Sequence, residues 1–576
     1  ILGGGPAGLS TAYHLTCKPG WEEEYEITVY QMGWRLGGKA ASSRADSEYG
    51  ARIEEHGIHL FGNFYLNMFQ MLDDCYTALY TDAEGNPYNP DDEPVTTLED
   101  AFSGCNFQGL PDFVKGHGWV FQTGWLAHND GKPWNGQLPD PATLVSGILY
   151  QITAVLTNKE PWFTPHHKPE SLIGKWWRPI EDHVLEGFAK TIDKLLERGV
   201  EDHSKILDVL KDIRRHTQKH LRHLAEKSLS WRWKFIQLDL ITTLIQVIIA
   251  DEVLALDEHG NLKNDIDRLD QWDYREWLQR HDVDPMTLAS GFAQIVPNIG
   301  FNYPNGNSTG FPAFSAAPYV YFFLRQVMAE GDALYFFAAG TGDTIVAPVY
   351  RTLLKRGVKF RFFHKVTDVV PGENTIDEVV FDQQATLKDQ GDYEPMIRVK
   401  NMYTWPAKPL YDQLEEGEEL REGGYDLESY WTPWKGQTKT IRRGGDGPDD
   451  FDYVVMAISV AAHPAVCPKL LEHRSWWKDM VDNIDAFPTQ QLQVWLDKPV
   501  EKLGWDFGLE GTTNRVVGAN YTYPFITFTD FTDLLKWEDW PTDHAPQSVI
   551  YWSGPLQKPA EWPDYDQHQF PAEQDI

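Results

Sequence analysis

The stretch GGGPAGLSTAYHL at residues 3–15, followed by EITVY at residues 26–30, decides the fold of the N-terminal part. In a Gly-x-Gly-x-x-Gly turn the first glycine makes the tight turn, the second lets the backbone approach a pyrophosphate, and the third lets helix and strand pack closely. The N-terminus of the next helix attracts phosphate through its N–H groups. This order predicts a βαβ unit of a dinucleotide-binding fold. The expected cofactor-binding residues of the turn are Gly3, Gly5, Pro6, Ala7 and Gly8.

The position after the second strand departs from that pattern. Dinucleotide-binding folds usually carry an acidic residue there, which holds the ribose hydroxyls, whereas this chain has Gln31. An amide can donate to and accept from a ribose oxygen, but it lacks the charge that makes the contact strong. We expect Gln31 to occupy the ribose position as a weaker ligand.

A second glycine pair follows at once, in GWRLGGKA at residues 33–40. This R-x-G-G-[KR] stretch resembles the flavoprotein family that includes amine oxidases and carotenoid desaturases. In that family the two glycines let the chain pass close to FAD, and the basic residues lie near its phosphates. The resemblance implies FAD as the cofactor. The residues that it implies as FAD contacts are Arg35, Gly37, Gly38 and Lys39.

The segment EHGIHLF at residues 55–61, followed by Tyr65 and Asn67, narrows the resemblance. It is similar to the E-x-G-[IL]-H-[IL]-F…Y-x-N segment of plant-type phytoene and ζ-carotene desaturases, with one glycine out of register at Gly62. In those enzymes the segment runs beside the isoalloxazine ring. The resemblance implies His59 as the candidate catalytic residue, the alternative being a packed structural histidine. The implied flavin-lining residues are Glu55, His56, Gly57 and Ile58.

Two later blocks also resemble this family. In residues 338–369 a helix leads to a strand whose backbone would meet the adenine edge at Val366. FDYVVMAIS at residues 451–459 is similar to an element that packs the FAD domain, and we expect a buried strand there. The segment that closes over the flavin in the family is absent after residue 463. We therefore expect that the C-terminus is missing, that a separate chain supplies this segment, or that the site is completed differently; the short opening strand likewise suggests a missing start.

Composition and charge exclude several classes of protein. The chain has 576 residues, with 51 Lys and Arg against 85 Asp and Glu, and a formal net charge of −34. Phosphate repels such a surface, so we expect no nucleic-acid partner, and contact with an anionic membrane is disfavoured. The four cysteines lack ligand spacing, so we expect no disulfide scaffold and no metal site. Cysteine usage and the lack of a recognisable signal peptide favour a cytoplasmic protein.

The middle of the chain is expected to be helical. Apolar residues recur along one stripe of residues 204–227. Residues 235–254 are the most apolar segment, but Asp239 and several polar residues interrupt it, so we predict a buried helix and no membrane span.

These patterns predict an α/β fold of the glutathione-reductase or amine-oxidase type, with a Rossmann-like FAD-binding domain interleaved with a mixed α+β substrate domain. The expected FAD-binding segments are residues 1–80, 335–385 and 450–470. The expected remainder is a mainly helical substrate domain at 81–334, an acidic insertion at 386–449 and a β-rich part of the substrate domain at 471–576.

The resemblance implies an FAD-dependent oxidoreductase that moves a hydride from a substrate C–H to flavin N5. A small organic substrate of the carotenoid or lipid type follows from the nearest motifs. An amine or amino acid is the alternative that the acidic charge favours. A redox-neutral flavin isomerase and a non-catalytic flavin-binding subunit remain open as well. We also keep open a homo-oligomer or a second chain as partner.

Overall fold

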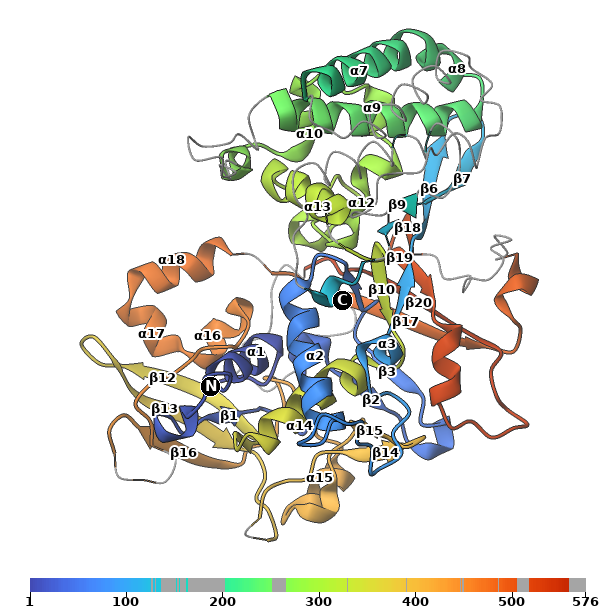
Figure 1. Cartoon of the computed structure of the whole chain (residues 1–576). Coiled ribbons are helices and arrows are strands. Elements are labelled where there is room, and N and C mark those ends of the chain that lie inside the picture. The colour runs from blue at the N-terminus through green and yellow to red at the C-terminus, as the bar shows by residue number, and fades with distance from the viewer. Residues whose placement is uncertain are drawn as a thin grey trace.

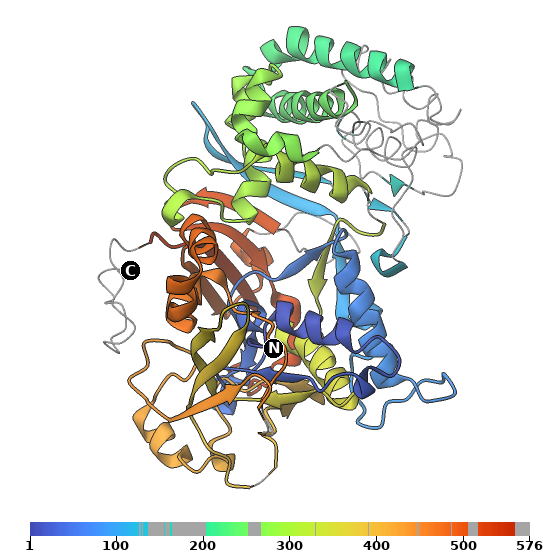
Figure 2. The ribbon, with the colours of Figure 1, turned by 90° about the vertical axis from the view of Figure 1, so that its left-hand side faces the viewer.

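The computed structural model describes most of this chain, and its parts are arranged along one long axis. The helices of the middle of the sequence lie at one end, and the β14–β15 hairpin and α15 lie at the other, with the C-terminal strands between them (Figures 1 and 2). The described residues are 1–125, 128–129, 131–135, 152, 155, 162–163, 203–250, 266–328, 330–389, 391–445, 447, 450–484, 486–504 and 517–558.

The N-terminal βαβ unit is present. Leu2 ends the first strand, α1 spans Pro6–Leu15, and β1 spans Thr28–Tyr30 and runs parallel to Leu2. On its other side β1 pairs in parallel with β11 (Lys359–Arg361), and Leu2 pairs in parallel with Met456. One parallel sheet therefore draws its members from three distant parts of the sequence. The predicted mixed α/β fold with a Rossmann-like domain is confirmed.

The expectation of a buried strand over residues 451–459 is wrong. Within this segment only Phe451 and Met456 form β-bridges, and Tyr453 is 83% exposed. The segment lies at the outer edge of the parallel sheet, where it pairs with Leu2 on one side only. Because Leu2 supplies only a single bridge to this segment at Met456, no ladder of successive pairs forms, and the apolar run is half-buried without becoming a regular strand.

Two larger sheets are also present. In the first, β12 (His364–Pro371), β13 (Ile376–Gln383) and β16 (Gln437–Arg442) are antiparallel, and their inner face packs on Leu2 and β1. The second sheet has six strands. Their order is β17 (Thr489–Leu496), β20 (Ser548–Pro555), β19 (Phe525–Asp530), β18 (Val517–Thr522), β6 (Phe107–Val114) and β7 (Gly118–Trp125). A hairpin from the early part of the chain thus extends the C-terminal sheet.

The two predicted helices of the middle region are confirmed over their described residues. α7 (His203–His216) continues through a π-helical turn (Thr217–Leu221) into α8 (Arg222–Ala225), and Leu210, Ile213 and Leu221 of the apolar stripe are buried. α9 spans Leu229–Ala250 and is buried, and residues 251–254 lie outside the described residues. The carboxylate of Asp239 is satisfied inside this core, where it accepts from the side chain of Gln218 and the backbone of Asp284. Among the described helices, none has the length and apolarity to cross a membrane.

The remaining strands and helices of the described chain have the following bounds. The strands are β2 (Ser42–Arg44), β3 (Ile53–Glu55), β4 (Leu60–Gly62), β5 (Phe102–Cys105), β8 (His128–Asn129), β9 (Trp162–Phe163), β10 (Leu334–Phe337), β14 (Ile397–Val399) and β15 (Met402–Thr404). The helices are α2 (Leu66–Tyr80), α3 (Leu98–Ala101), α10 (Tyr274–Arg280), α11 (Pro285–Leu288), α12 (Gly291–Ile299), α13 (Ala316–Met328), α14 (Ala347–Lys355), α15 (Gly417–Gly423), α16 (His463–Val466), α17 (Pro468–His473) and α18 (Ser475–Asn483).

Candidate functional site

The two glycine turns of the N-terminal segment face each other backbone to backbone. The N–H of Gly37 donates to the carbonyl of Gly4 at 2.9 Å, and a Cβ on Gly38 would lie 3.1 Å from the Cα of Gly5. Gly5 also begins α1, and no side chain of the described chain caps this helix N-terminus. The N–H groups of the first turn of α1 are therefore available to an anion.

The glycines of the first turn have different physical reasons. Gly3 has a φ of +105°, which side chains rarely adopt, and a Cβ on Gly8 would lie 1.9 Å from the carbonyl oxygen of Gly3. These two positions need glycine for the turn itself. At Gly5 the backbone is ordinary, with a φ of −80°, and a Cβ would meet Gly38 at a normal 3.7 Å. Protein packing therefore gives no reason for glycine at position 5, whereas a bound pyrophosphate does, so the turn fits a dinucleotide.

The side chain of Gln31 is directed at the glycine turn. Its Oε1 atom accepts from the N–H of Gly4 at 3.0 Å. Gly38 and Lys39, from the second turn, are exposed beside it. The predicted cofactor contacts of the two turns therefore lie together at the N-terminus of α1.

Arg35 is already paired. Its guanidinium forks onto the carboxylate of Glu428, with Nε 3.0 Å and Nη2 2.8 Å from Oε2. Burial raises the pKa of Glu428, and the charge of Arg35 opposes that rise. Glu428 lies in the acidic insertion 386–449, where no motif in the sequence marks it as a partner of Arg35.

Val366 packs beside Leu2 and Tyr30, which directly precede the first glycine turn and Gln31. Its side chain is buried in the core that β12 shares with Leu2 and Tyr30. The predicted role of Val366 is a contact between its backbone and the adenine edge of the cofactor, and this role stays a prediction.

The second group of predicted residues surrounds His59. Its Nδ1 atom lies 2.7 Å from Oε2 of Glu55 and 2.8 Å from Oγ1 of Thr341. The N–H of Thr341 donates to the other oxygen of Glu55 at 2.8 Å. Burial alone would lower the pKa of His59, but the carboxylate of Glu55 outweighs it and raises this pKa above 6.5. His56 differs, because burial and the charge of Arg35 lower its pKa.

The turn that carries Thr341 is anchored by buried polar contacts. The N–H of Gly342 donates to Oγ of Ser42 at 2.6 Å. The guanidinium of Arg44 lies 2.6 Å from Oδ2 of Asp343, and both side chains are fully buried. These contacts tie β2 to the π-helical turn Gly342–Val346, which leads into α14. These buried contacts therefore hold the turn of the Glu55–His59–Thr341 cluster in place.

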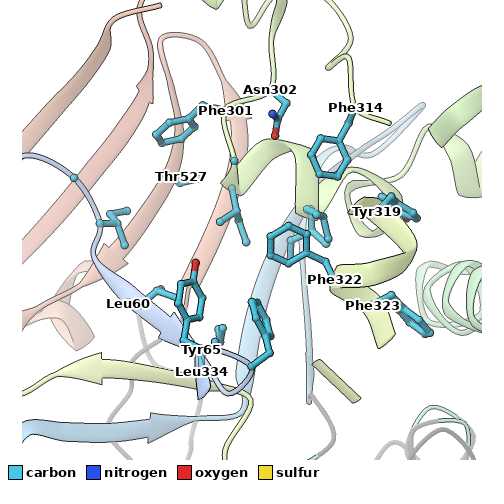
Figure 3. Close-up of a pocket in the computed structure, with 18 of the residues that line it drawn as sticks. Leu60, Tyr65, Phe301, Asn302, Phe314, Tyr319, Phe322, Phe323, Leu334 and Thr527 are labelled. Atoms are coloured by element: carbon cyan, nitrogen blue, oxygen red, sulfur yellow. The ribbon is translucent and has the colours of Figure 1, made fainter. Parts of the chain in front are cut away.

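A cavity of about 680 Å³ opens beside the histidine segment. Leu60 and Tyr65 from the N-terminal part and Phe314 and Phe322 from the helical part enclose it (Figure 3). Phe322 meets Phe64 edge to face, with ring centroids 5.3 Å apart. The lining residues are His56, Gly57, Ile58, His59, Leu60, Gly62, Phe64, Tyr65, Leu240, Ile241, Phe292, Ile295, Val296, Ile299, Gly300, Phe301, Asn302, Phe314, Tyr319, Phe322, Phe323, Leu334 and Thr527. None of these described lining residues is Asp, Glu, Lys or Arg.

The structure therefore brings the predicted residues together in two groups, one at the glycine turns and one at the cavity wall. It adds Thr341, Glu428 and the helical wall of the cavity, which sequence reasoning missed. Thr341 does lie in the block 338–369 that was singled out, whereas the apolar residues of α12 and α13 carry no signal that separates a cavity wall from a core. Within the described ranges, no cluster of three His, Cys, Asp or Glu is placed to hold a metal.

Comparisons with known proteins agree with the N-terminal fold. Residues 1–75 match the family model of the NAD(P)-binding Rossmann-like domain, which covers both glycine turns. A sequence comparison with curated proteins gives no significant match.

Solved structures are similar only at a coarse level. An oxidoreductase from Methanosarcina mazei is 10% identical over 96% of this chain and 78% of that chain, with a TM-score of 0.42. A Pyrococcus furiosus protein is 9% identical over 96% and 79%, with a TM-score of 0.40. A putrescine oxidase with redesigned cofactor binding is 12% identical over 97% and 75%, with a TM-score of 0.39. These TM-scores are low, and none of them bears on the function.

Proposed function

We propose that this protein is an FAD-dependent oxidoreductase that removes a hydride from a C–H bond of an apolar, polyene-like or lipid-like substrate. The observation that carries the proposal is the cavity beside the His56–His59 segment, whose described lining contains no Asp, Glu, Lys or Arg, together with the glycine turns that fit a dinucleotide. The bound flavin would supply the hydride-accepting chemistry. The chain's own residues bind, orient and exclude water.

The glycine turns support the cofactor half of the proposal. The N-terminus of α1 and the exposed turn at Gly38 and Lys39 offer N–H groups and positive charge to a pyrophosphate. Gly5 leaves the space that a side chain would fill.

The cavity supports the substrate half. A cationic amine buried in it would meet no carboxylate among the described lining residues, and an unpaired buried charge is costly. A polyene loses nothing by leaving water and gains contact with the rings of Phe314 and Phe322. We therefore place an apolar chain here, with its reactive end toward His56 and His59.

His59 is proposed as the polar end of this cavity. With Nδ1 held between Glu55 and Thr341, its ring is oriented by contacts outside the cavity. It would hold a proton near the substrate without itself forming a bond to it.

An amine substrate is the second candidate, because a net charge of −34 attracts cations to the protein as a whole. That attraction acts at the surface, whereas the cavity lining decides what is stable inside. The apolar substrate is therefore preferred.

Flavin spectroscopy tests both halves. The purified full chain is incubated with FAD, and the visible flavin band is recorded under anaerobic conditions before and after adding a C40 polyene in detergent or an amine panel. We expect retained flavin that only the polyene bleaches. A protein that takes up no FAD overturns the proposal, and bleaching by amines alone overturns its substrate half. Retained flavin that neither panel bleaches overturns the oxidoreductase assignment in favour of an isomerase or a non-catalytic subunit.

A further inference from the structure

The position that usually supplies the ribose-binding carboxylate is occupied by the amide of Gln31, which lacks a charge and has one of its two acceptor lone pairs already used within the protein. Oε1 of Gln31 accepts from the N–H of Gly4. Vicinal ribose hydroxyls are hydrogen-bond donors that a carboxylate satisfies best. The strand end therefore leaves this part of a dinucleotide without its strong partner.

A carboxylate from elsewhere in the chain stands beside that position. A Cβ on Gly33, two residues after Gln31, would lie 2.3 Å from Cγ and 2.7 Å from Oε1 of Glu428. Gly33 has no unusual φ, so its lack of a side chain is explained by the approach of Glu428. The side chain of Glu428 fills the space that any larger residue at position 33 would take.

The loop that carries Glu428 is held beside Met32 and Gly33 by hydrogen bonds. Nε2 of Gln384, which is fully buried, donates to the carbonyl of Met32 at 2.8 Å and to that of Leu427 at 2.9 Å. Asp426 accepts from the N–H of Glu428 at 2.8 Å. One side chain therefore bridges the strand end and the insertion, and the carboxylate has a fixed position.

The carboxylate of Glu428 can still accept hydrogen bonds, and a ligand can reach it. Arg35 makes its two shorter contacts with Oε2 and a longer one, of 3.2 Å, with Oε1. A carboxylate offers about four lone-pair directions. The side chain of Glu428 is 24% exposed, so a ligand can reach it beside the glycine turns.

We propose that Glu428, carried by the acidic insertion, supplies the carboxylate that binds the adenosine ribose of the dinucleotide in place of the acid missing at Gln31. This inference rests on the proposed function, since it assumes that FAD is the ligand of the glycine turns. Arg35 then acts as a positioning residue that holds the carboxylate and neutralises it when no ribose is bound. The insertion 386–449 becomes part of the cofactor site.

The test compares FAD with an analogue that lacks the adenosine 2′- and 3′-hydroxyls, and measures dissociation constants by flavin fluorescence on the cofactor-free full chain. We expect the wild-type protein to prefer FAD by about tenfold to a hundredfold, as for a charge-assisted hydrogen bond. Glu428→Gln should lose most of this preference, because an amide binds a ribose hydroxyl more weakly than a carboxylate does. The matched control is Glu416→Gln, because Glu416 lies in the same insertion but accepts from the N–H of Thr386; it should keep the wild-type preference.

Two further variants guard against a folding defect. Glu428→Asp keeps a charge for Arg35 but withdraws the carboxylate, and its preference for FAD should fall. Gln31→Glu combined with Glu428→Gln should recover the preference, because the acid returns to the strand end. A wild-type protein that binds no FAD overturns the proposed function. A wild-type protein that prefers FAD, with the same preference in Glu428→Gln or Glu428→Asp, overturns this inference alone.

Discussion

The guanidinium of Arg44 lies 2.6 Å from the carboxylate of Asp343, and neither side chain reaches solvent. Arg44 also donates to the backbone carbonyl of Trp537 at 2.7 Å. Burial raises the pKa of Asp343, and the charge of Arg44 opposes the rise. This pair connects β2 with the turn before α14, and Arg44 also contacts the C-terminal part through Trp537. Because the same turn carries Thr341, the pair helps to hold the His59 cluster in place.

Removing one partner of this pair should destabilise the whole protein. Asp343→Ala would leave the buried charge of Arg44 without the opposite charge of Asp343, and we expect a loss of about 3–5 kcal/mol in the free energy of unfolding. Urea denaturation followed by fluorescence measures it. Arg44→Met combined with Asp343→Leu should cost less than the sum of the single changes. A single variant within about 1 kcal/mol of wild type would contradict this role.

The glycine turn offers a pair of substitutions that separate folding from cofactor binding. Gly5→Ala should leave the melting temperature of the cofactor-free protein unchanged, because its Cβ meets only an ordinary contact of 3.7 Å. It should weaken FAD retention, and Gly5→Val should abolish it. Gly8→Ala should lower stability by about 1–3 kcal/mol or more, because its Cβ would lie 1.9 Å from the carbonyl oxygen of Gly3. Full flavin occupancy in Gly5→Val would refute the pyrophosphate assignment.

The Glu55–His59 contact should make stability depend on pH. The pKa of His59 is raised in the folded protein by Glu55, against the effect of burial. The contact therefore stabilises the fold fully below the ordinary pKa of 6.5, and this contribution is lost as the pH rises through the folded pKa. Glu55→Gln should cost about 1 kcal/mol more at acidic pH than at alkaline pH. Denaturation curves of both proteins across the pH range measure the difference.

Replacing His56 should change the stability of the protein with pH in the opposite direction. The pKa of His56 is lowered by burial and by Arg35, so its protonation opposes folding at acidic pH. His56→Gln should gain stability relative to wild type as the pH falls. If the stability of Glu55→Gln depends on pH in the same way as that of wild type, the charge interaction between Glu55 and His59 is ruled out.

A carboxylate placed in the cavity should discriminate between substrate classes. Ile299 lines the cavity and is 43% exposed, so Ile299→Asp should fold. We expect it to slow flavin bleaching by a polyene about tenfold, because the charge must lose water when the chain binds. Leu354→Asp is the control, since Leu354 is similarly exposed at 44% on α14 and does not line the cavity. Equal rates in both variants would show that the polyene binds elsewhere.

The sequence predicted what depends on neighbouring residues. The glycine turn, α1 and β1 follow from a motif within thirty residues of the N-terminus, and the helices at 203–250 follow from apolar periodicity. The contacts that organise the site are of another kind. His59 and Thr341 are 282 positions apart, and Arg35 and Glu428 are 393 apart. Spacing carries no information over such separations.

The errors of sequence reasoning have the same origin. Residues 451–459 have the composition of a buried strand, but their place at a sheet edge depends on which distant strand lies beside them. The apolar residues of α12 and α13 are spaced like core residues, and only their position around the same cavity as β4 makes part of them a cavity wall. The pattern of a sequence therefore identifies which residues are apolar, but it does not identify the part of the chain that packs against them.

The parallel sheet behind the glycine turns also dictates when the site can form during synthesis. Its edge member at Met456 leaves the ribosome long after the first 75 residues. A nascent chain that ends before this point has the phosphate-binding turn but an incomplete sheet to hold it. Long-range pairing of this kind slows folding, because loop closure precedes the contacts that reward it. We therefore expect an N-terminal fragment alone not to retain the proposed dinucleotide.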